Sequence, residues 1–438
     1  MIGKSALFAA LAAVVLITVS HAKPPEPSPF SVSPKSGPSA IGPLSFDAGY
    51  PDTATAELLF DQMHFQRAVQ TYIWGTAYVN AMGLLKGFGE HGVTPENRHM
   101  LVFPYRAGPQ HIGMTWNETT PYFFFIMDLG KDGPIVVDFP GGEILAHFVD
   151  FKMRGIGEVG AVGPDGGKGG KYLLLPPNHD GDVPDGYYVY RSRSNLVFMY
   201  GRALREGIEG DDVLTTLETI VFYPLADAKN PPARATQVSI KEEKFDSDWP
   251  KDIGFWDYLF EVMNRDVVEA IDKPFHDWMM PLGYTHGEPF EPNEKQKEIL
   301  AKAARVGAAM MVNLAYNNAE RNPTARWWDD REWETIVSVT TADMETDTTL
   351  ELTDRASNWY QITMNAAYLY GRTEPLIGEG TNYVSGFRDG DGDYLDGGRN
   401  YKLTVPANVP ARRFWASTVY SNASRSFVQT DQRIATRD

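Results

Sequence analysis

The stretch TWNETTPYFFFIMDLGKDGPIVVDFP, residues 115–140, decides the fold that this sequence predicts. It holds two short apolar runs, 122–127 and 135–139, separated by the turn-forming residues GKDGP. Short apolar runs bounded by glycine, proline and aspartate are typical of β-strands. The same punctuation continues in KYLLL at 171–175 and in YYVY at 187–190. We therefore expect several antiparallel strands, arranged as a sandwich or barrel and not as a parallel sheet.

Segments with helical periodicity lie on both sides of this β-rich region. Apolar residues recur at helical spacing over 53–86, behind Asp52 or Thr53 as the cap. Three more helices are expected, over 255–271, 293–321 with Asn293 as the cap, and 351–372. Strand-like runs then return as YKLTV at 401–405, RRFWASTVYS at 412–421 and SFVQT at 426–430.

This order predicts a β-rich α+β fold with two jelly-roll-like antiparallel β-sandwich domains and a helical connection between them. The expected parts are an N-terminal domain over 51–230, a helical connector over 231–330 and a C-terminal β-sandwich over 331–438.

The amino terminus has the features of an export signal. Lys4 supplies a positive charge, residues 6–19 are apolar, and Ser20-His21-Ala22 offers a cleavage site. Residues 1–22 are therefore interpreted as a signal peptide, with an uncleaved anchor as the alternative. Residues 23–50 are rich in proline, serine and glycine, which is typical of a flexible leader. These features predict a periplasmic or secreted protein.

Composition narrows the possible chemistry and partners. The 438 residues include no cysteine, which excludes disulfides, thiol catalysis and cysteine-ligated metals. The net charge of −17 repels phosphate backbones and anionic lipids. We expect no nucleic-acid partner and no membrane contact beyond export, and homo-oligomerisation stays open.

Three motifs that could bind ions or phosphates were compared with simpler interpretations. DGDGDYLDGG, residues 389–398, places aspartates like a calcium loop, but Tyr394 replaces the required glycine and Asn400 replaces the bidentate glutamate. A turn is the preferred interpretation.

GIGEVG at 155–160 matches GxGxxG but lacks the preceding strand and the following helix of that motif, so a glycine-rich hairpin is expected. Glu143, His147 and Asp150 would share one face only if their segment were helical, as a zinc site would need. We therefore predict no metal and no cofactor.

The segment at 115–140 resembles the hallmark of bacterial exported proteins that pair two domains of unknown function, numbered 1254 and 1214. The match is carried by Asn117, Thr120, Tyr122, Asp128, Leu129, Gly133, Pro134 and Pro140, whereas Thr119 stands where the family has aspartate. GDYLDGGRNYKLTVPANVPARRFWASTVYS resembles the signature of the second domain, through residues that include Asp396, Tyr401, Trp415 and Tyr420. The resemblance implies two jelly-roll-type sandwiches, and it implies that strands after Asp438 are missing.

Candidate site residues follow from this hallmark and from the surplus of aromatic side chains. Asn117, Thr120, Tyr122 and Trp415 are predicted to bind a substrate, and Asp150 is the candidate general acid or base. No GxSxG nucleophile motif occurs. Two functions stay open: an exported protein that binds or processes a glycan or small organic substrate in a β-sandwich groove, or a non-catalytic structural or assembly module. Whether the chain is an enzyme is not decided by its sequence.

Overall fold

The computed structural model describes residues 35–116, 118–204, 208–335, 344–362, 383–409, 411, 415–431 and 436–437. The chain divides into two compact units, Met1–Phe60 and Asp61–Asp438. The predicted signal peptide over 1–22 lies outside the described residues.

The described part of the first unit contains short strand pairs. Strand β1 (Gly37–Ser39) pairs with β2 (Gly42–Leu44), and β3 (Phe46–Asp47) pairs with β4 (Tyr50–Pro51). They occupy part of the stretch in which the sequence predicted a flexible leader. Asp52 accepts a hydrogen bond from the Thr55 amide at 2.8 Å, which confirms it as a helix cap.

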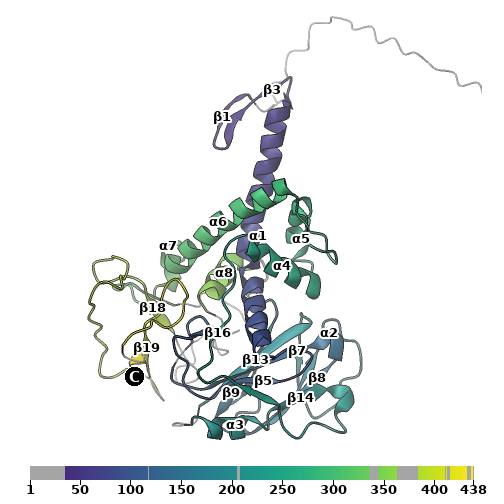
Figure 1. The fold of residues 1–438 in the computed structure, drawn as a ribbon, viewed down its shortest axis with the longest axis vertical. Coiled ribbons are helices and arrows are strands. Elements are labelled where there is room, and N and C mark those ends of the chain that lie inside the picture. Colours follow the sequence, from purple (N-terminus) through teal and green to yellow (C-terminus); the bar gives the residue numbers. More distant parts are fainter. Residues whose placement is uncertain are drawn as a thin grey trace, which may run out of the picture. The chain divides into compact units, whose positions relative to one another are not determined.

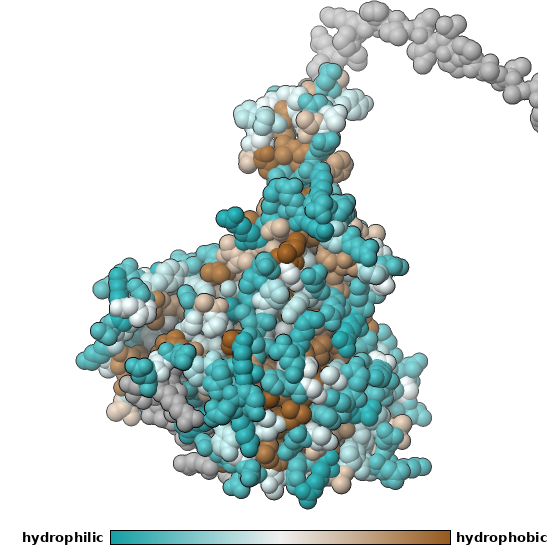
Figure 2. All heavy atoms as spheres, viewed as in Figure 1, coloured by the Kyte–Doolittle hydropathy of each residue, from teal (hydrophilic) through white to brown (hydrophobic). Residues whose placement is uncertain are grey.

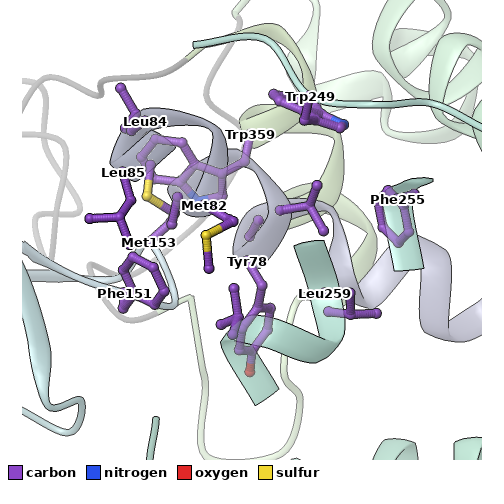
Figure 3. Close-up of a cluster of buried hydrophobic side chains, with 14 of the residues drawn as sticks. Tyr78, Met82, Leu84, Leu85, Phe151, Met153, Trp249, Phe255, Leu259 and Trp359 are labelled. Atoms are coloured by element: carbon purple, nitrogen blue, oxygen red, sulfur yellow. The ribbon is translucent and has the colours of Figure 1, made fainter. Parts of the chain in front are cut away.

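Helix α1 (Thr53–Glu90) follows and confirms the helix predicted over 53–86. Between Ala68 and Phe88 its apolar residues occupy every side of the helix, which is typical of a helix buried in a core. In the second unit this part of α1 contributes many members of the largest hydrophobic cluster. Figure 3 shows members of this cluster, among them Tyr78, Met82, Leu85, Phe151, Met153 and Trp359.

Glycines let the backbone of α1 come very close to another segment. A Cβ atom added at Gly83 would lie 2.3 Å from the carbonyl oxygen of Ser247, and one added at Gly87 would lie 2.5 Å from that of Asp246. Both are far below van der Waals contact, so no larger residue fits without moving the backbone.

Among the described residues the remaining helices are α2 (Leu129–Asp132), α3 (Asp211–Leu217), α4 (Gly254–Arg265), α5 (Lys273–Met279), α6 (Glu294–Tyr316), α7 (Asn318–Arg321) and α8 (Leu352–Gln361), with 3-10 turns η1 (Leu225–Asp227), η2 (Met280–Leu282) and η3 (Pro323–Ala325). Figure 1 shows α4, α5, α6 and α8 gathered about α1. Asn293 and Gln296 form a capping box at the start of α6, which confirms the predicted cap. Helix α4 ends earlier than predicted because Asp266 is extended and its carboxylate binds Ser194 and the Asn195 amide.

Two larger sheets follow α1 in the chain. Their strands are β5 (Met100–Phe103), β7 (Tyr122–Asp128), β8 (Ile135–Phe139), β9 (Ile144–Asp150), β10 (Gly155–Gly160), β11 (Gly170–Leu175), β12 (Tyr188–Arg191), β13 (Leu196–Ala203), β14 (Val221–Pro224) and β15 (Gln237–Ser239). One sheet has the order β10-β9-β13-β7-β5-β15 and the other β12-β11-β8-β14. Most pairs are antiparallel, as predicted, but β11–β12 and β15–β5 are parallel. β9 and β10 form the predicted glycine-rich hairpin.

Alternation along the strands creates two cores. On β7, Phe123 and Phe125 join a cluster that includes Val137 and Leu174 of the four-stranded sheet. Phe124 belongs to the cluster of α1, where its ring lies 5.2 Å from that of Phe88. The six-stranded sheet thus has the second sheet on one face and α1 on the other.

The remaining strands are short: β6 (His111–Ile112) pairs with β16 (Phe245–Asp246), β17 (Trp333–Thr335) with β18 (Val384–Gly386), and β19 (Ser417–Thr418) with β20 (Thr436–Arg437). Residues 401–405, predicted as a strand, are irregular. The fold is a mixture of helices and sheets, and no sheet of the described residues closes on itself. In the described part of 331–438 the strands form only the pairs β17–β18 and β19–β20, beside helix α8, so the predicted C-terminal sandwich is not seen there.

The molecular face in Figure 2 is mainly hydrophilic, with hydrophobic side chains in scattered patches. In the part of the chain that the structure describes, no helix combines the length and apolar character needed to cross a bilayer.

Candidate functional site

The predicted substrate-binding residues near position 120 lie in packed surroundings. Asn117 is outside the described residues. Thr120 and Tyr122 are 5% and 4% exposed. The Tyr122 ring lies 5.6 Å from that of Trp116 and 6.2 Å from that of Phe124, measured between centroids. These contacts belong to the aromatic core of the second unit.

Asp150 ends β9 and is 1% exposed. Its Oδ1 accepts the backbone N–H groups of Lys152 and Arg154, both at 2.9 Å. Its Oδ2 accepts the Arg154 Nε–H at 2.7 Å. Both carboxylate oxygens are therefore engaged within the loop between β9 and β10.

Asp150 belongs to a buried group of charges, here called the ion cluster: Asp150, Lys152, Arg154, Glu269 and Asp272. The Lys152 ammonium donates to Glu269 at 2.8 Å and to Asp272 at 2.5 Å. Arg154 bridges Asp150 at 2.7 Å and Glu269 at 2.8 Å. Burial raises the pKa of Glu269, but the two cations outweigh burial and lower its pKa to about 2. The cluster joins the β9–β10 loop to the segment between α4 and α5.

Further groups extend the ion cluster. Tyr78 of α1 donates its hydroxyl proton to Asp272 at 2.8 Å, and burial holds the pKa of this phenol well above its usual value. Arg193 donates to Glu269 at 2.7 Å and to Glu345 at 2.8 Å. Elements far apart in the sequence therefore meet through paired charges.

The predicted site residues do not form one site. Asp150 pairs across the sheet with Val197 of β13, whereas Tyr122 pairs with Arg202 of the same strand. Five residues along a strand span roughly 17 Å, so the two side chains lie toward opposite ends of the sheet. Trp415 is 38% exposed, unlike Tyr122 and Asp150. The functional roles of these residues stay predictions.

The two candidate metal sites considered from the sequence do not have the geometry that metal binding requires. Residues 144–150 form a strand, so His147 and Asp150 point to opposite faces of the sheet. His147 is buried, its ring meets that of Tyr200 edge-on at 4.0 Å, and burial lowers its pKa to about 3. At 389–393 the Asp389 side chain accepts the amides of Asp391 and Asp393, as in an aspartate turn. Among the described residues, no group of three or more histidines and carboxylates converges as metal ligands would.

The structure contains a cleft between four helices that the sequence did not predict. It has a volume of about 740 Å³ and is lined by α1, α5, α6 and α8. Its aromatic wall contains Trp74 of α1 and Phe275 of α5, whose rings stack at 4.3 Å with planes 6° apart. Trp278 follows, with its ring 5.2 Å from that of Phe275. We call this feature the helical cleft.

Polar groups at the helical cleft are few. Gln70 comes from α1, Arg305 and Asn313 from α6, and Thr353 from α8. Arg305 is exposed, and within the described ranges no carboxylate lies at salt-bridge distance from it. An apolar wall combined with an unneutralised cation fits a ligand with an apolar body and an anionic group.

Comparisons with known proteins agree with the resemblance in the sequence. The model of the protein of unknown function DUF1254 matches residues 99–222, and that of DUF1214 matches residues 380–438. The fold and these matches define a class: mixed helix-and-sheet proteins that carry two domains of unknown function. The chain thus carries a DUF1254 match followed by a DUF1214 match, the pairing that the resemblance in the sequence predicted.

Solved structures provide two further comparisons. The chain is similar to the VPA0106 protein from Vibrio parahaemolyticus, with 19% identity, a TM-score of 0.48, and coverage of 85% of this chain and 83% of that one. It is also similar to an uncharacterized protein from Burkholderia cenocepacia, with 11% identity, a TM-score of 0.23, and coverage of 60% and 62%. Both TM-scores lie below 0.5, so the description of the fold rests on this chain alone. No curated protein matches the chain.

Proposed function

We propose that the protein binds a small amphiphilic organic anion in the helical cleft. The observation that carries this proposal is the pairing of the Trp74–Phe275–Trp278 wall with the cation of Arg305 in a space of about 740 Å³. Pockets for small organic ligands usually measure roughly 300–1,000 Å³ and combine apolar walls with a few polar groups.

The apolar wall would hold the body of the ligand. Stacked and edge-to-face rings form a stiff surface, because each ring limits the rotation of the next. Met310 of α6 also lines the cleft and is 42% exposed, so apolar surface there contacts water when the cleft is empty. Covering this surface would favour binding, because apolar area leaves water.

Arg305 would select for charge. A guanidinium retains its proton at any physiological pH and binds a carboxylate through two parallel hydrogen bonds. The side chain is exposed, so its contribution would be modest and would weaken at high salt. A preference for anions over neutral analogues therefore identifies this role of Arg305 more specifically than a change in affinity does.

Two alternatives from the sequence differ from this proposal in ways that can be tested. A glycan would also stack on tryptophan, but it would need several hydrogen-bonding groups around its hydroxyls. A non-catalytic assembly module would use the same apolar surface for a protein partner and would not prefer small anions. Export to the periplasm, and a jelly-roll relationship for the two larger sheets, are parts of the same proposal that rest on the sequence.

The test is a titration with the aromatic sulfonate anilinonaphthalene sulfonate, whose fluorescence rises in apolar surroundings. Trp278→Ala should weaken binding about tenfold, because a large contact surface is lost. Arg305→Gln should weaken it up to about fivefold, as expected for an exposed charge pair. Trp327→Ala and Arg331→Gln, exposed residues outside the cleft, are matched controls.

Competition then identifies the ligand class. Dodecanoate should displace the probe better than dodecanol, and Arg305→Gln should remove that preference. Equal effects of the cleft variants and their controls would disprove the proposal. Displacement by oligosaccharides but not by dodecanoate would favour the glycan alternative.

A further inference from the structure

A second group of charges, away from the helical cleft, places two cations on one carboxylate oxygen. The Lys251 ammonium lies 2.5 Å from Asp248 Oδ1, and Arg425 Nη2 lies 2.6 Å from the same atom. The two cationic nitrogens are therefore within about 5 Å of each other. Asp246 supplies a further negative charge, but the repulsion between two cations at one carboxylate oxygen still favours the loss of one proton.

The proton cannot come from Arg425. Guanidinium groups keep their charge in proteins. This one is also 3% exposed and lies over two aromatic rings, 5.2 Å from the centroid of Trp249 and 4.7 Å from that of Tyr360. The structure therefore fixes a permanent positive charge beside Lys251.

Lys251 is the group that can respond. Its ammonium lies over the Trp249 ring at 4.4 Å and donates to the Trp249 carbonyl. Burial is the largest cause that lowers its pKa, Arg425 lowers it further, and Asp248 and Asp246 oppose them, with a result of about 8. The side chain is nevertheless 29% exposed, so part of it faces solvent.

We propose that Lys251, a partly exposed amine that shares a carboxylate oxygen with the buried Arg425 guanidinium, is a nucleophile that forms Schiff bases with small aldehydes. The lone pair of Nζ attacks the carbonyl carbon and forms a carbon–nitrogen bond. The carbonyl oxygen then leaves as water with the two protons of the amine, and a neutral imine remains. No oxidant or reductant is needed. This site is independent of the proposed ligand of the helical cleft, because Lys251 does not line that cleft.

The test is reductive labelling of the full chain with propionaldehyde and cyanoborohydride at pH 7.5, with each modified lysine located by peptide mass spectrometry. With a pKa of about 8, roughly a quarter of the Lys251 side chains are uncharged at this pH, against about one in a thousand at 10.5. A less basic amine is also less nucleophilic, so we expect Lys251 to react about tenfold faster than a normal lysine. Lys86 is the internal control, since it is 40% exposed, pairs with Glu261 at 2.9 Å and lies over the Tyr258 ring.

Two variants move the rate in opposite directions. In Arg425→Gln the Asp248 carboxylate pairs with Lys251 only, so labelling at pH 7.5 should slow several-fold, while burial still leaves Lys251 faster than Lys86. Asp248→Asn removes the opposing carboxylate, so labelling should persist to a lower pH than in the parent protein. If Arg425→Gln does not fold, Asp248→Asn and the pH profile of the parent protein decide the matter. Labelling of Lys251 no faster than Lys86, or an unchanged pH profile in Asp248→Asn, would overturn the proposal.

Discussion

Replacing Lys152 with methionine would test how far the ion cluster holds the second unit together. The ammonium of Lys152 has three N–H donors, and all three have acceptors: Glu269 at 2.8 Å, Asp272 at 2.5 Å and the carbonyl of Val267 at 3.1 Å. Its side chain is 2% exposed. Methionine retains the length and apolar contacts of the chain but removes the charge and all three hydrogen bonds.

The loss in the free energy of unfolding depends on the buried carboxylates that remain when the Lys152 ammonium is removed. At an effective dielectric constant of about 20, each contact with a carboxylate is worth about 6 kcal/mol before desolvation. Desolvation cancels most of that sum, yet removing one partner of a buried pair typically costs about 3–5 kcal/mol. Glu269 still has Arg154 and Asp272 still has Tyr78, so we expect a loss of about 3 kcal/mol in the free energy of unfolding.

The measurement is urea unfolding at neutral pH, followed by circular dichroism and tryptophan fluorescence. Lys86→Met removes an exposed pair with Glu261 and should cost less than about 1 kcal/mol. The double variant Lys152→Met/Asp272→Asn should recover part of the loss, because the stranded carboxylate is neutralised while Tyr78 keeps an acceptor. Losses that are equal in Lys152→Met and Lys86→Met would refute the reasoning, as would a double variant no more stable than the single one.

Three other results are expected. Asp150→Asn keeps acceptors for the loop amides but removes the charge opposite Arg154, so urea unfolding should show a loss of about 2–3 kcal/mol; full stability together with lost turnover of a substrate would instead support the predicted catalytic role. Gly83→Ala should lower stability by about 1–2 kcal/mol through its clash with the Ser247 carbonyl, whereas Gly89→Ala, with open space around it in the same helix, should gain up to about 1 kcal/mol. The pKa of His147 is about 3 when folded, below its usual 6.5, so the unfolded chain binds the extra proton and stability falls as pH drops from 6.5 toward 3; His147→Leu should flatten that fall in urea titrations at several pH values, and an unchanged slope would contradict it.

Local sequence signals predicted the elements well where local chemistry decides them. The Asp52 and Asn293 caps mark helix starts because their side chains bind amides within three residues. Strands β7 and β8 are bounded by turn residues that can be read directly from the sequence. The end of α4 was predicted too late, since the residue that stops it, Asp266, is held by Ser194 and Asn195, some seventy positions earlier in the chain.

The helical cleft could not be predicted in the same way. Its wall combines Trp74 with Phe275 and Trp278, which are 201 and 204 positions away, and with parts of α6 and α8. Aromatic residues within helices are usually core residues, and periodicity does not show which of them also line a cleft. The Lys251 group depends in the same way on Arg425, 174 positions away.

The position of Asp150 connects the charge pattern of the sequence with the fold. A general acid or base needs a proton site that faces the substrate, either directly or through one water. Asp150 directs one oxygen to two backbone amides and the other to Arg154, which is itself held by Glu269. These contacts favour a role in fastening the β9–β10 loop to the segment between α4 and α5. Acidic residues are also the usual partners of buried arginines and lysines, so an acid at the end of a strand does not by itself identify a catalytic residue. In this chain the helical cleft and the cations around Asp248 are better candidates for functional sites.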